Sequence, residues 1–300
     1  MLDRRWTSQW WARPGRMASN TTLLVVVAFL LSFPSRSSGQ TLTRIDYPGA
    51  LQTVPTGISA RGDIVGQYLD SSLSGHSFLL QKGTYTTIEV PGALATGVAG
   101  INAAGDIVGA YLDATGQHGF LLRNGTVTAI DVPGAQYTFP AGINAARQIV
   151  GQYSDARGTH GFLWDDGTFT TIDAPGSVGL TVASGIDSSG RIVGTYFSTN
   201  LAHGFVLDDG EYTVIDYPGA TSTNLVGINP AGQIVGYSYT NGVSNTFLWD
   251  QGTFTLIDVP FGTQPFANAI NASGAIVGSY VDPERTTGVE FALRGFLLRF

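Results

Sequence analysis

The sequence predicts an all-β fold, a six-bladed β-propeller in which each blade has four antiparallel strands. Three observations lead to this prediction. The tripeptide Ile-Val-Gly recurs at steps of 42 or 43 residues. Each repeat contains four short strand-like segments, a pattern typical of propeller blades. The first and last copies are incomplete in complementary ways. The tripeptide begins at Ile64, Ile107, Ile149, Ile192, Ile234 and Ile276.

The second copy of the repeat illustrates the first two strands. We expect one strand over residues 98–102 and a second over residues 106–112. The turn between them reads Asn-Ala-Ala-Gly, and Gly105 can adopt the positive φ that such a turn requires. In the second strand Ile107 and Tyr111 lie on one face, because side chains alternate with a period of two. These features predict an antiparallel hairpin.

The second half of the repeat predicts another hairpin. A third strand is expected over residues 118–123 and a fourth over residues 126–131. Asn124 and Gly125 between them form a strong two-residue turn signal, since both tolerate positive φ. Pro133 follows the fourth strand and ends it, because proline cannot donate a hydrogen bond to a sheet.

The two ends of the repeat region indicate how the repeats are closed. Residues 41–50, TLTRIDYPGA, match a fourth strand, and residues 294–300, RGFLLRF, match a third strand that lacks its fourth. A single four-stranded sheet is too small to be stable alone, and an open stack would leave two apolar end faces. We therefore expect the N-terminal strand to pair in the last blade and close the ring.

The first 39 residues differ in composition from the rest. Arginines come first, then the apolar run 23–31 (LLVVVAFLL), then small residues at 37–39. This order is typical of a secretory signal peptide, and the run is shorter than the roughly 20 residues that span a bilayer. Met17 is an alternative start, and a retained membrane anchor is the alternative interpretation. The expected organisation is a signal peptide over 1–39 and the propeller over 40–300.

Charge and cysteine content restrict the expected partners. Residues 40–300 carry 10 basic and 21 acidic side chains, a net charge of −11, and the chain has no cysteine. A basic face that would bind nucleic acid or anionic lipid is not expected. We expect a secreted, extracellular or periplasmic monomer without stable membrane insertion after signal cleavage. Its stability must come from packing and not from disulfides.

At these motifs the chain resembles the HAF-repeat proteins, a bacterial family of extracellular repeat proteins. The resemblance rests on Gly-Ile-Asn-x-x-Gly-x-Ile-Val-Gly followed by His-Gly-Phe-Leu, and on FLWD at 162–165 and 247–250. It covers about residues 41–300. It implies an exported repeat protein and carries no established activity. The chain departs by having glycine where the family name has alanine, and Ile-Asp-x-Pro-Gly-Ala where many members have a leucine- and glycine-rich link.

The recurring polar residues are candidates for structural roles. The four histidines, His76, His118, His160 and His203, occupy equivalent positions. Equivalent positions stand far apart in a ring, so we expect each histidine to hydrogen-bond locally, to a nearby aspartate or to the backbone. A shared metal site is the alternative. The aspartate of Ile-Asp-x-Pro-Gly is expected to accept hydrogen bonds from N–H groups of the Pro-Gly turn. The asparagine of Gly-Ile-Asn is expected to stabilise the turn in which it lies. No metal or cofactor is predicted.

Candidate ligand-binding residues lie where the copies differ, because loops carry function. The loops between blades and those between second and third strands should share one face. In the last copy 18 residues separate Ile276 from the residue aligned with histidine, against 11 or 12 elsewhere. A tolerated surface insertion is the alternative explanation. The predicted ligand-binding residues are Gln136, Tyr137, Phe139, Phe266, Glu284, Arg285 and Glu290.

The expected function is binding of an extracellular ligand, glycan or protein by a non-enzymatic propeller. The alternative is a carbohydrate hydrolase or lyase with carboxylates at the channel mouth, since such enzymes use a pair of carboxyl groups. A structural component of the envelope or matrix is a third possibility. Carboxylates that converge at the channel mouth would favour the enzyme, and dispersed carboxylates with exposed aromatic residues would favour binding. No predicted catalytic residue follows from the sequence.

Overall fold

The computed structural model describes residues 40–284 and 292–300. The chain divides into two compact units, Met1–Ser37 and Ser38–Phe300, and only the second is described below. The expected signal peptide over 1–39, the alternative start Met17, and the candidates Arg285 and Glu290 lie outside the described residues. Those assignments remain predictions.

The described part of the chain contains strands and turns but no helix. The strands are β1 (Thr41–Ile45), β2 (Gln52–Ile58), β3 (Ile64–Leu69), β4 (Gly75–Gln81), β5 (Thr84–Ile88), β6 (Ala95–Ile101), β7 (Ile107–Leu112), β8 (Gln117–Arg123), β9 (Thr126–Ile130), β10 (Tyr137–Ile143), β11 (Ile149–Ser154), β12 (Thr159–Asp165), β13 (Thr168–Ile172), β14 (Thr181–Ile186), β15 (Ile192–Phe197), β16 (Ala202–Asp208), β17 (Glu211–Ile215), β18 (Ser222–Ile228), β19 (Ile234–Thr240), β20 (Val243–Asp250), β21 (Thr253–Leu256), β22 (Thr263–Ile270), β23 (Ile276–Val281) and β24 (Leu293–Arg299). The four strands expected in the second copy are present as β6 to β9.

The strands form antiparallel sheets in a propeller-like arrangement, so the all-β prediction is confirmed. Four sheets have four strands each: β2 to β5, β6 to β9, β10 to β13, and β22-β23-β24-β1. The expectation of six separate four-stranded sheets is not met, because β14 to β21 form one eight-stranded sheet. The two halves of that sheet are joined only where β16 runs parallel to β18, through the pair Ala202 and Ser222.

The joined sheet has a local cause. The amide of Ala202 donates to the carbonyl of Thr221 at 3.3 Å, where the start of a third strand meets the start of the next repeat. A similar contact occurs one repeat earlier, where the amide of Thr159 donates to the carbonyl of Gly179 at 3.0 Å. There it leaves only an isolated bridge between Thr159 and Leu180. The sequence gives no signal for this single backbone contact.

The predicted closure by the N-terminal strand is confirmed. β1 pairs antiparallel with β24 over five residues, from Thr41 opposite Arg299 to Ile45 opposite Gly295. Ile45 is only 5% exposed. The guanidinium of Arg294 donates to Asp46 at 2.8 Å, which fixes the end of the pairing.

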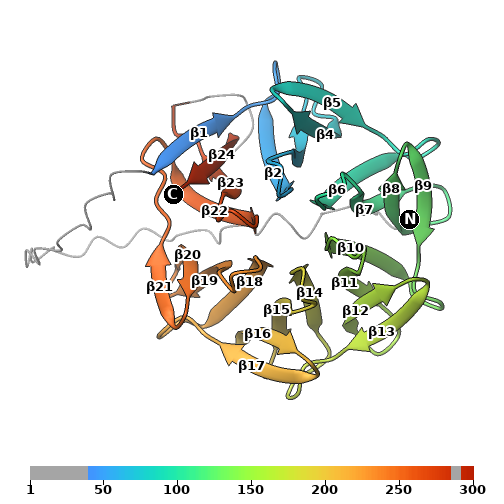
Figure 1. Ribbon diagram of the computed structural model, residues 1–300, viewed down its shortest axis with the longest axis vertical. Coiled ribbons are helices and arrows are strands. Elements are labelled where there is room, and N and C mark those ends of the chain that lie inside the picture. The colour runs from blue at the N-terminus through green and yellow to red at the C-terminus, as the bar shows by residue number, and fades with distance from the viewer. Residues whose placement is uncertain (1–39, 285–291) are drawn as a thin grey trace, which may run out of the picture. The chain divides into compact units, whose positions relative to one another are not determined.

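The inner strands of the sheets pack in cyclic order. β2, β6, β10, β14, β18 and β22 each contact the next, and β22 contacts β2 again. Figure 1 shows these strands around the centre, with β5, β9, β13, β17, β21 and β1 at the outside. The sheets of the second unit are therefore arranged as a closed ring.

The core between neighbouring sheets repeats one packing motif. The phenylalanine of each third strand is fully buried, at Phe78, Phe120, Phe162, Phe205, Phe247 and Phe296. Its ring covers the glycine of Ile-Val-Gly on the neighbouring strand, as Phe78 covers Gly66. A Cβ added at Gly66 would lie 2.7 Å from the Cζ atom of Phe78. Close packing leaves no room for that atom, which explains why glycine and phenylalanine recur together.

An asparagine side chain links each of several repeats to the next. The Oδ1 atom of Asn144 accepts the amide of Gln148 at 3.0 Å, so the expected role in its own turn is confirmed. Its Nδ2 atom also donates to the carbonyl of Asp187 in the next repeat, at 3.1 Å. Asn102, Asn229 and Asn271 donate to the next repeat in the same way. This second role is not apparent from the sequence.

Asp187 occupies the asparagine position in the fourth repeat and cannot donate. Arg191 replaces the missing donor: its Nε atom donates to Asp187 Oδ2 at 2.7 Å. A terminal nitrogen of the same guanidinium donates to the carbonyl of Pro230 in the next repeat, at 3.1 Å. A hydrogen bond to the following repeat is thus kept by a different side chain.

Removal of residues 1–46 tests the closure. The deletion exposes the edge of β24 and removes Ile45 from the core, so the free energy of unfolding should fall by at least about 2–5 kcal/mol, the usual cost of deleting a buried isoleucine side chain. Urea unfolding measures the change. The matched control is removal of residues 1–39, which keeps β1 and should leave the stability of residues 40–300 unchanged. Equal stability of the two proteins would contradict the closing role of β1.

Asn144→Asp tests the link between repeats. The aspartate keeps the acceptor for the turn but loses the donor to Asp187, so the free energy of unfolding should fall by about 1–3 kcal/mol. Adding Gln148→Arg recreates the arrangement of Asp187 and Arg191 and should restore part of the loss. Equilibrium unfolding in urea compares the three proteins. A single variant as stable as the wild type would show that the bond to the next repeat contributes nothing.

Candidate ligand-binding face

The four turns of each repeat lie at two opposite ends of its strands. Tight hairpins connect the first strand to the second and the third to the fourth, as at 102–106 and 124–125. The other two connections, as at 113–116 and 131–136, lie at the opposite ends because the strands are antiparallel. We call these two surfaces the hairpin face and the loop face. The predicted candidates Gln136 and Glu284 lie in loop-face connections.

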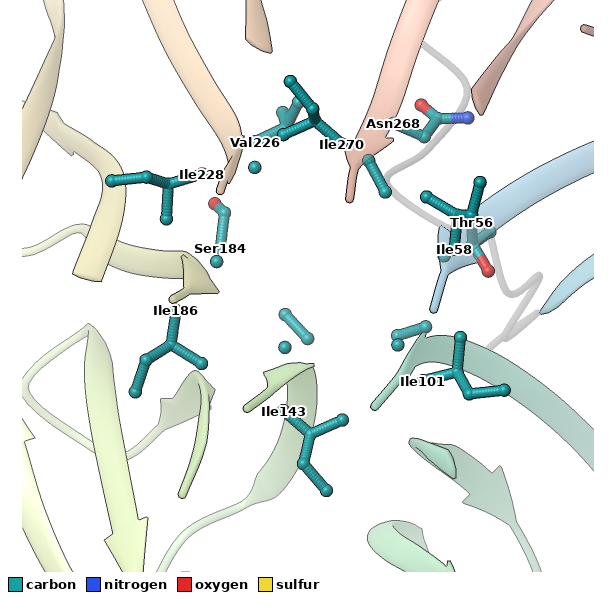
Figure 2. A pocket seen from close by; sticks show the side chains of 18 residues that line it. Thr56, Ile58, Ile101, Ile143, Ser184, Ile186, Val226, Ile228, Asn268 and Ile270 are labelled. Carbon is teal, nitrogen blue, oxygen red and sulfur yellow. The ribbon is translucent and has the colours of Figure 1, made fainter. Parts of the chain in front are cut away.

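The inner strands enclose a narrow channel of about 100 Å³. Its wall consists of small and apolar residues, and no aspartate or glutamate is among them: Thr56, Gly57, Ile58, Ala99, Gly100, Ile101, Ala141, Gly142, Ile143, Ser184, Gly185, Ile186, Val226, Gly227, Ile228, Asn268, Ala269 and Ile270. Figure 2 shows the labelled isoleucines pointing away from the opening, toward the sheets. Ser184 and Asn268 are among the polar groups around it.

Glycines let the inner strands approach one another closely. A Cβ added at Gly100 would lie 2.9 Å from the carbonyl oxygen of Ala141 on the next inner strand. A Cβ added at Gly185 would lie 3.1 Å from the Cα atom of Gly227. The channel is narrow for this reason, and any sizeable ligand must bind at its mouth and not inside it.

The mouth of the channel on the loop face carries an inner-strand position that varies among the repeats. These residues lie two before the wall positions such as Ala141 and Asn268, so they are nearer to the loop face along the same strands. We call them the channel rim. The channel rim consists of Val54, Gly97, Phe139, Val182, Asn224 and Phe266, all half-buried.

Two of the predicted ligand-binding residues, Phe139 and Phe266, belong to the channel rim. They lie on β10 and β22, which are three apart in the cyclic order of six inner strands, so they stand on opposite sides of the mouth. Tyr137 is the first residue of β10, and exposed Gln136 precedes it. Glu284 lies outside this group, in the exposed turn after β23.

Tyr237 packs against the channel rim and was not among the residues predicted from the sequence. Its ring meets the ring of Phe266 edge to face at a centroid distance of 5.9 Å. Burial raises the pKa of Tyr237 above its ordinary value, so the phenol stays neutral. Sequence variation could have identified this position, because the residue after Ile-Val-Gly varies among the copies: Gln67, Ala110, Gln152, Thr195, Tyr237 and Ser279.

The histidines form local hydrogen bonds, as predicted. Nδ1 of His118 lies 2.9 Å from Asp131 Oδ2, and Nδ1 of His203 lies 2.7 Å from Asp216 Oδ2. His160 and His76 have the same kind of partner in Asp173 and Glu89. In the last sheet Arg294 replaces the histidine and binds Asp46. Within residues 40–284 and 292–300, no three His, Cys, Asp or Glu side chains are grouped as ligands of one metal would be.

The prediction that the repeated aspartate accepts hydrogen bonds from the Pro-Gly turn is wrong in two repeats. Besides histidine, Asp131 Oδ1 accepts the amide of Gly119 at 3.1 Å, so the carboxylate serves the third strand and not the Pro-Gly turn. The same holds for Asp216 and the amide of Gly204. The turn amide of Val132 donates instead to Oγ1 of Thr138 on the next inner strand, at 2.9 Å. The aspartate therefore binds two groups of its own sheet, the histidine side chain and the amide of the residue after it.

A second aspartate holds the loop between the second and third strands. Hydrogen bonds from the Thr115 hydroxyl and amide lower the pKa of Asp113. The amide of Arg157 lowers the pKa of Asp155 in the next repeat. Asp113 Oδ1 also lies 3.5 Å from Nε2 of His118, so His118 stands between two carboxylates. The loop-face carboxylates described here are thus bound in separate repeats and do not converge on the channel.

Comparison with known proteins places the chain by fold. No protein-family model and no curated protein matches it. The solved structure of a catalytically inactive virginiamycin B lyase from Staphylococcus aureus with quinupristin is 13% identical, covers 87% of this chain and 100% of that one, and has a TM-score of 0.53. TolB from Acinetobacter baumannii is 11% identical, with coverages of 67% and 52% and a TM-score of 0.54. A Mycobacterium tuberculosis puromycin-hydrolyzing peptidase is 11% identical, with coverages of 83% and 53% and a TM-score of 0.52.

These identities are low, so the similarity shows a β-propeller fold and nothing about activity. The chain spans about half the length of the latter two proteins. Among the described residues there is no helix long and apolar enough to cross a membrane.

The lowered pKa values predict how stability responds to acid. Asp113 and Asp155 have folded-state pKa values below the ordinary 3.8. Their stabilising contribution is therefore present above about pH 4 and is lost as the pH falls through the lower, folded values. Asp113→Asn and Thr115→Val should each flatten the loss of stability below about pH 4. Urea unfolding at several pH values measures this slope.

The exposed Thr126 provides the control for that experiment, because Thr126→Val removes a hydroxyl at the other end of the same sheet. The control should keep the slope of the wild type. An Asp113→Asn variant with the unchanged slope would show that this carboxylate does not contribute to acid sensitivity.

Proposed function

We propose that this chain is an exported six-bladed β-propeller of the HAF-repeat type that binds an extracellular ligand, a glycan or a protein, at the mouth of its channel on the loop face. The observation that carries the proposal is the channel rim. There the repeats differ from one another, and Phe139, Phe266 and Asn224 lie near an opening whose lining, among the described residues, includes no carboxylate.

The count of six blades rests on the cyclic contacts of six inner strands. The eight-stranded sheet counts as two blades, because a single parallel pair joins its halves. Six copies of the repeat then correspond to six blades, and the sheet β22-β23-β24-β1 is the last of them. This count makes Phe139 and Phe266 members of blades on opposite sides of the mouth.

The side chains at the rim suit a ligand with apolar faces and hydroxyl or amide groups. Phe139, Phe266 and Tyr237 offer ring surfaces, and rings of this kind contribute strongly to recognition. Asn224 and Gln67 supply amides, although each amide nitrogen already has one partner, Ser222 Oγ at 2.8 Å and the Val98 carbonyl at 3.4 Å. A pyranose ring or an aromatic side chain of a protein partner meets these requirements.

Catalysis of carbohydrate cleavage is the second candidate, and one arrangement favours it. Asp113 and Asp131 both approach His118, at 3.5 and 2.9 Å, so two carboxylates lie close together on the loop face. Similar folds include a lyase and a hydrolysing peptidase. The carboxylates are engaged with histidine and with backbone amides, however, and they lie in loop-face connections and not in the channel lining. Binding without catalysis therefore fits better.

Export of the chain is part of the proposal. The basic start and short apolar run within residues 1–39 support a cleaved signal peptide. The acidic net charge of residues 40–300 argues against nucleic acid as a partner. We propose that the propeller acts as a secreted or periplasmic monomer. Mass spectrometry of the mature N-terminus would test the cleavage, which should fall near residue 39.

Probing a glycan and protein array with residues 40–300 identifies the ligand and tests the site. Phe139→Ala and Phe266→Ala should each weaken the affinity for any bound ligand by about tenfold or more, the usual effect of truncating a central aromatic contact. The matched control is Leu256→Ala, which truncates an exposed apolar residue on the outer strand β21 and should leave binding unchanged.

Ligands found on the array also distinguish binding from catalysis. A bound glycan that is cleaved by the wild type but not by Asp131→Asn would favour the hydrolase or lyase. A ligand whose binding is unaffected by both phenylalanine substitutions would place the binding site away from the channel rim.

A further inference from the structure

A second concave site lies on the hairpin face, between the sheet that closes the ring and the first sheet of the chain. It has a volume of about 510 Å³, larger than the channel. Ile45 and Leu297 come from the closing sheet, and Ile64 and Leu80 come from the sheet β2 to β5. A pocket of this size can hold a molecule as large as a sugar. We call it the seam pocket.

Three cationic side chains line the seam pocket: Arg61, Lys82 and Arg299. The described residues contain nine lysines and arginines. Six have a partner: five form ion pairs and one lies over the ring of Phe261, at Arg123, Arg147, Arg157, Arg191, Arg294 and Arg44. The other three have no ion pair among the described residues, and all three lie at this pocket.

The other repeats show what usually happens to such side chains on the hairpin face. Arg147 binds Asp106 of the preceding repeat at 3.0 Å. Gln148 donates to Asp165 across its strand pair at 3.0 Å, and Gln233 donates to Asp250 in the same way. Polar groups at these positions are therefore paired within the protein elsewhere in the ring.

The residues at the seam break this pattern. Arg299 occupies the position of Asp165 and Asp250, but Ala275 stands where the glutamine partner would be. Arg61 is the one arginine at its turn position, where the other copies have alanine or serine. Like charges repel, and an anion bound in the pocket would offset this repulsion.

The pocket also contains acceptors. Asp63 is 8% exposed, and no side-chain hydrogen bond or ion pair of its carboxylate occurs among residues 40–284 and 292–300. The amide of Gln81 lies beside it in the lining. The pocket therefore combines a site for an anion with an acceptor for hydroxyl groups.

We propose that the seam pocket binds an acidic sugar, a sugar-sized molecule whose oxyanion group contacts Arg61, Lys82 and Arg299 and whose hydroxyl groups donate to Asp63. The oxyanion is a carboxylate or a phosphate, since both accept charge-assisted hydrogen bonds from arginine and lysine. This site lies on the face opposite the channel rim and is independent of the ligand proposed there.

Calorimetry at low ionic strength with four probes tests the proposal: D-galacturonate, glucose 6-phosphate, inorganic phosphate and neutral D-galactose. One or both acidic sugars should bind more tightly than inorganic phosphate, and galactose should not bind. The stronger of the two acidic sugars identifies the oxyanion. Added sodium chloride should weaken the binding, because the contacts are charged and exposed.

Arg61→Gln, Lys82→Gln and Arg299→Gln should each weaken the binding of the preferred acidic sugar by about tenfold, and the triple variant should abolish it. Arg157→Gln removes an exposed arginine on the loop face and is the matched control, with unchanged affinity expected. Thermal unfolding of each variant reports whether it is folded. A folded triple variant that binds like the wild type overturns the proposal. So does the absence of binding by both acidic sugars, or equal binding of galactose or inorganic phosphate.

Discussion

The fold depends on one constraint: each sheet has two apolar faces, and both must be covered. Phe78 and its five equivalents fill the space between neighbouring sheets, over a glycine that leaves room for the ring. No sheet can satisfy this requirement alone, and in a line of sheets the two at the ends cannot. Closure of the ring removes the ends, and the pairing of β1 with β24 makes closure part of the hydrogen-bonded sheet structure.

The recurring polar residues of the repeat stabilise this arrangement of sheets. The asparagine of the first turn joins neighbouring repeats, and the histidine of the third strand holds the carboxylate that follows the fourth. Where a repeat lacks the usual residue, another takes over its task, as Arg191 does beside Asp187. A residue that recurs at such a position therefore reports on the architecture and not on the ligand.

Function is to be sought where the repeats stop being equivalent. Two places stand out among the described residues. At the channel rim, side chains range from Gly97 to Phe139 on strands that otherwise match. At the seam, Arg61, Lys82 and Arg299 depart from the pairing seen in other repeats. The two places lie on opposite faces, so one protein of this design can present two separate binding surfaces. A similar backbone in every repeat makes such local differences easy to accommodate.

The sequence by itself determined the strand content, the repeat boundaries and the closing partnership of β1 and β24, because these follow from periodicity and from matching the two ends of the repeat region. It also indicated that the histidines act locally, since equivalent positions in a ring cannot meet. Only the tertiary structure decided which residues lie together across repeats. The contact of Tyr237 with Phe266, the bond from Asn144 to Asp187 and the pocket that Arg61 and Arg299 both line bring together residues from different repeats. The joining of β16 to β18 through Ala202 could not be predicted from the sequence either. One backbone hydrogen bond depends on the distance between two strand segments and not on the type of their side chains.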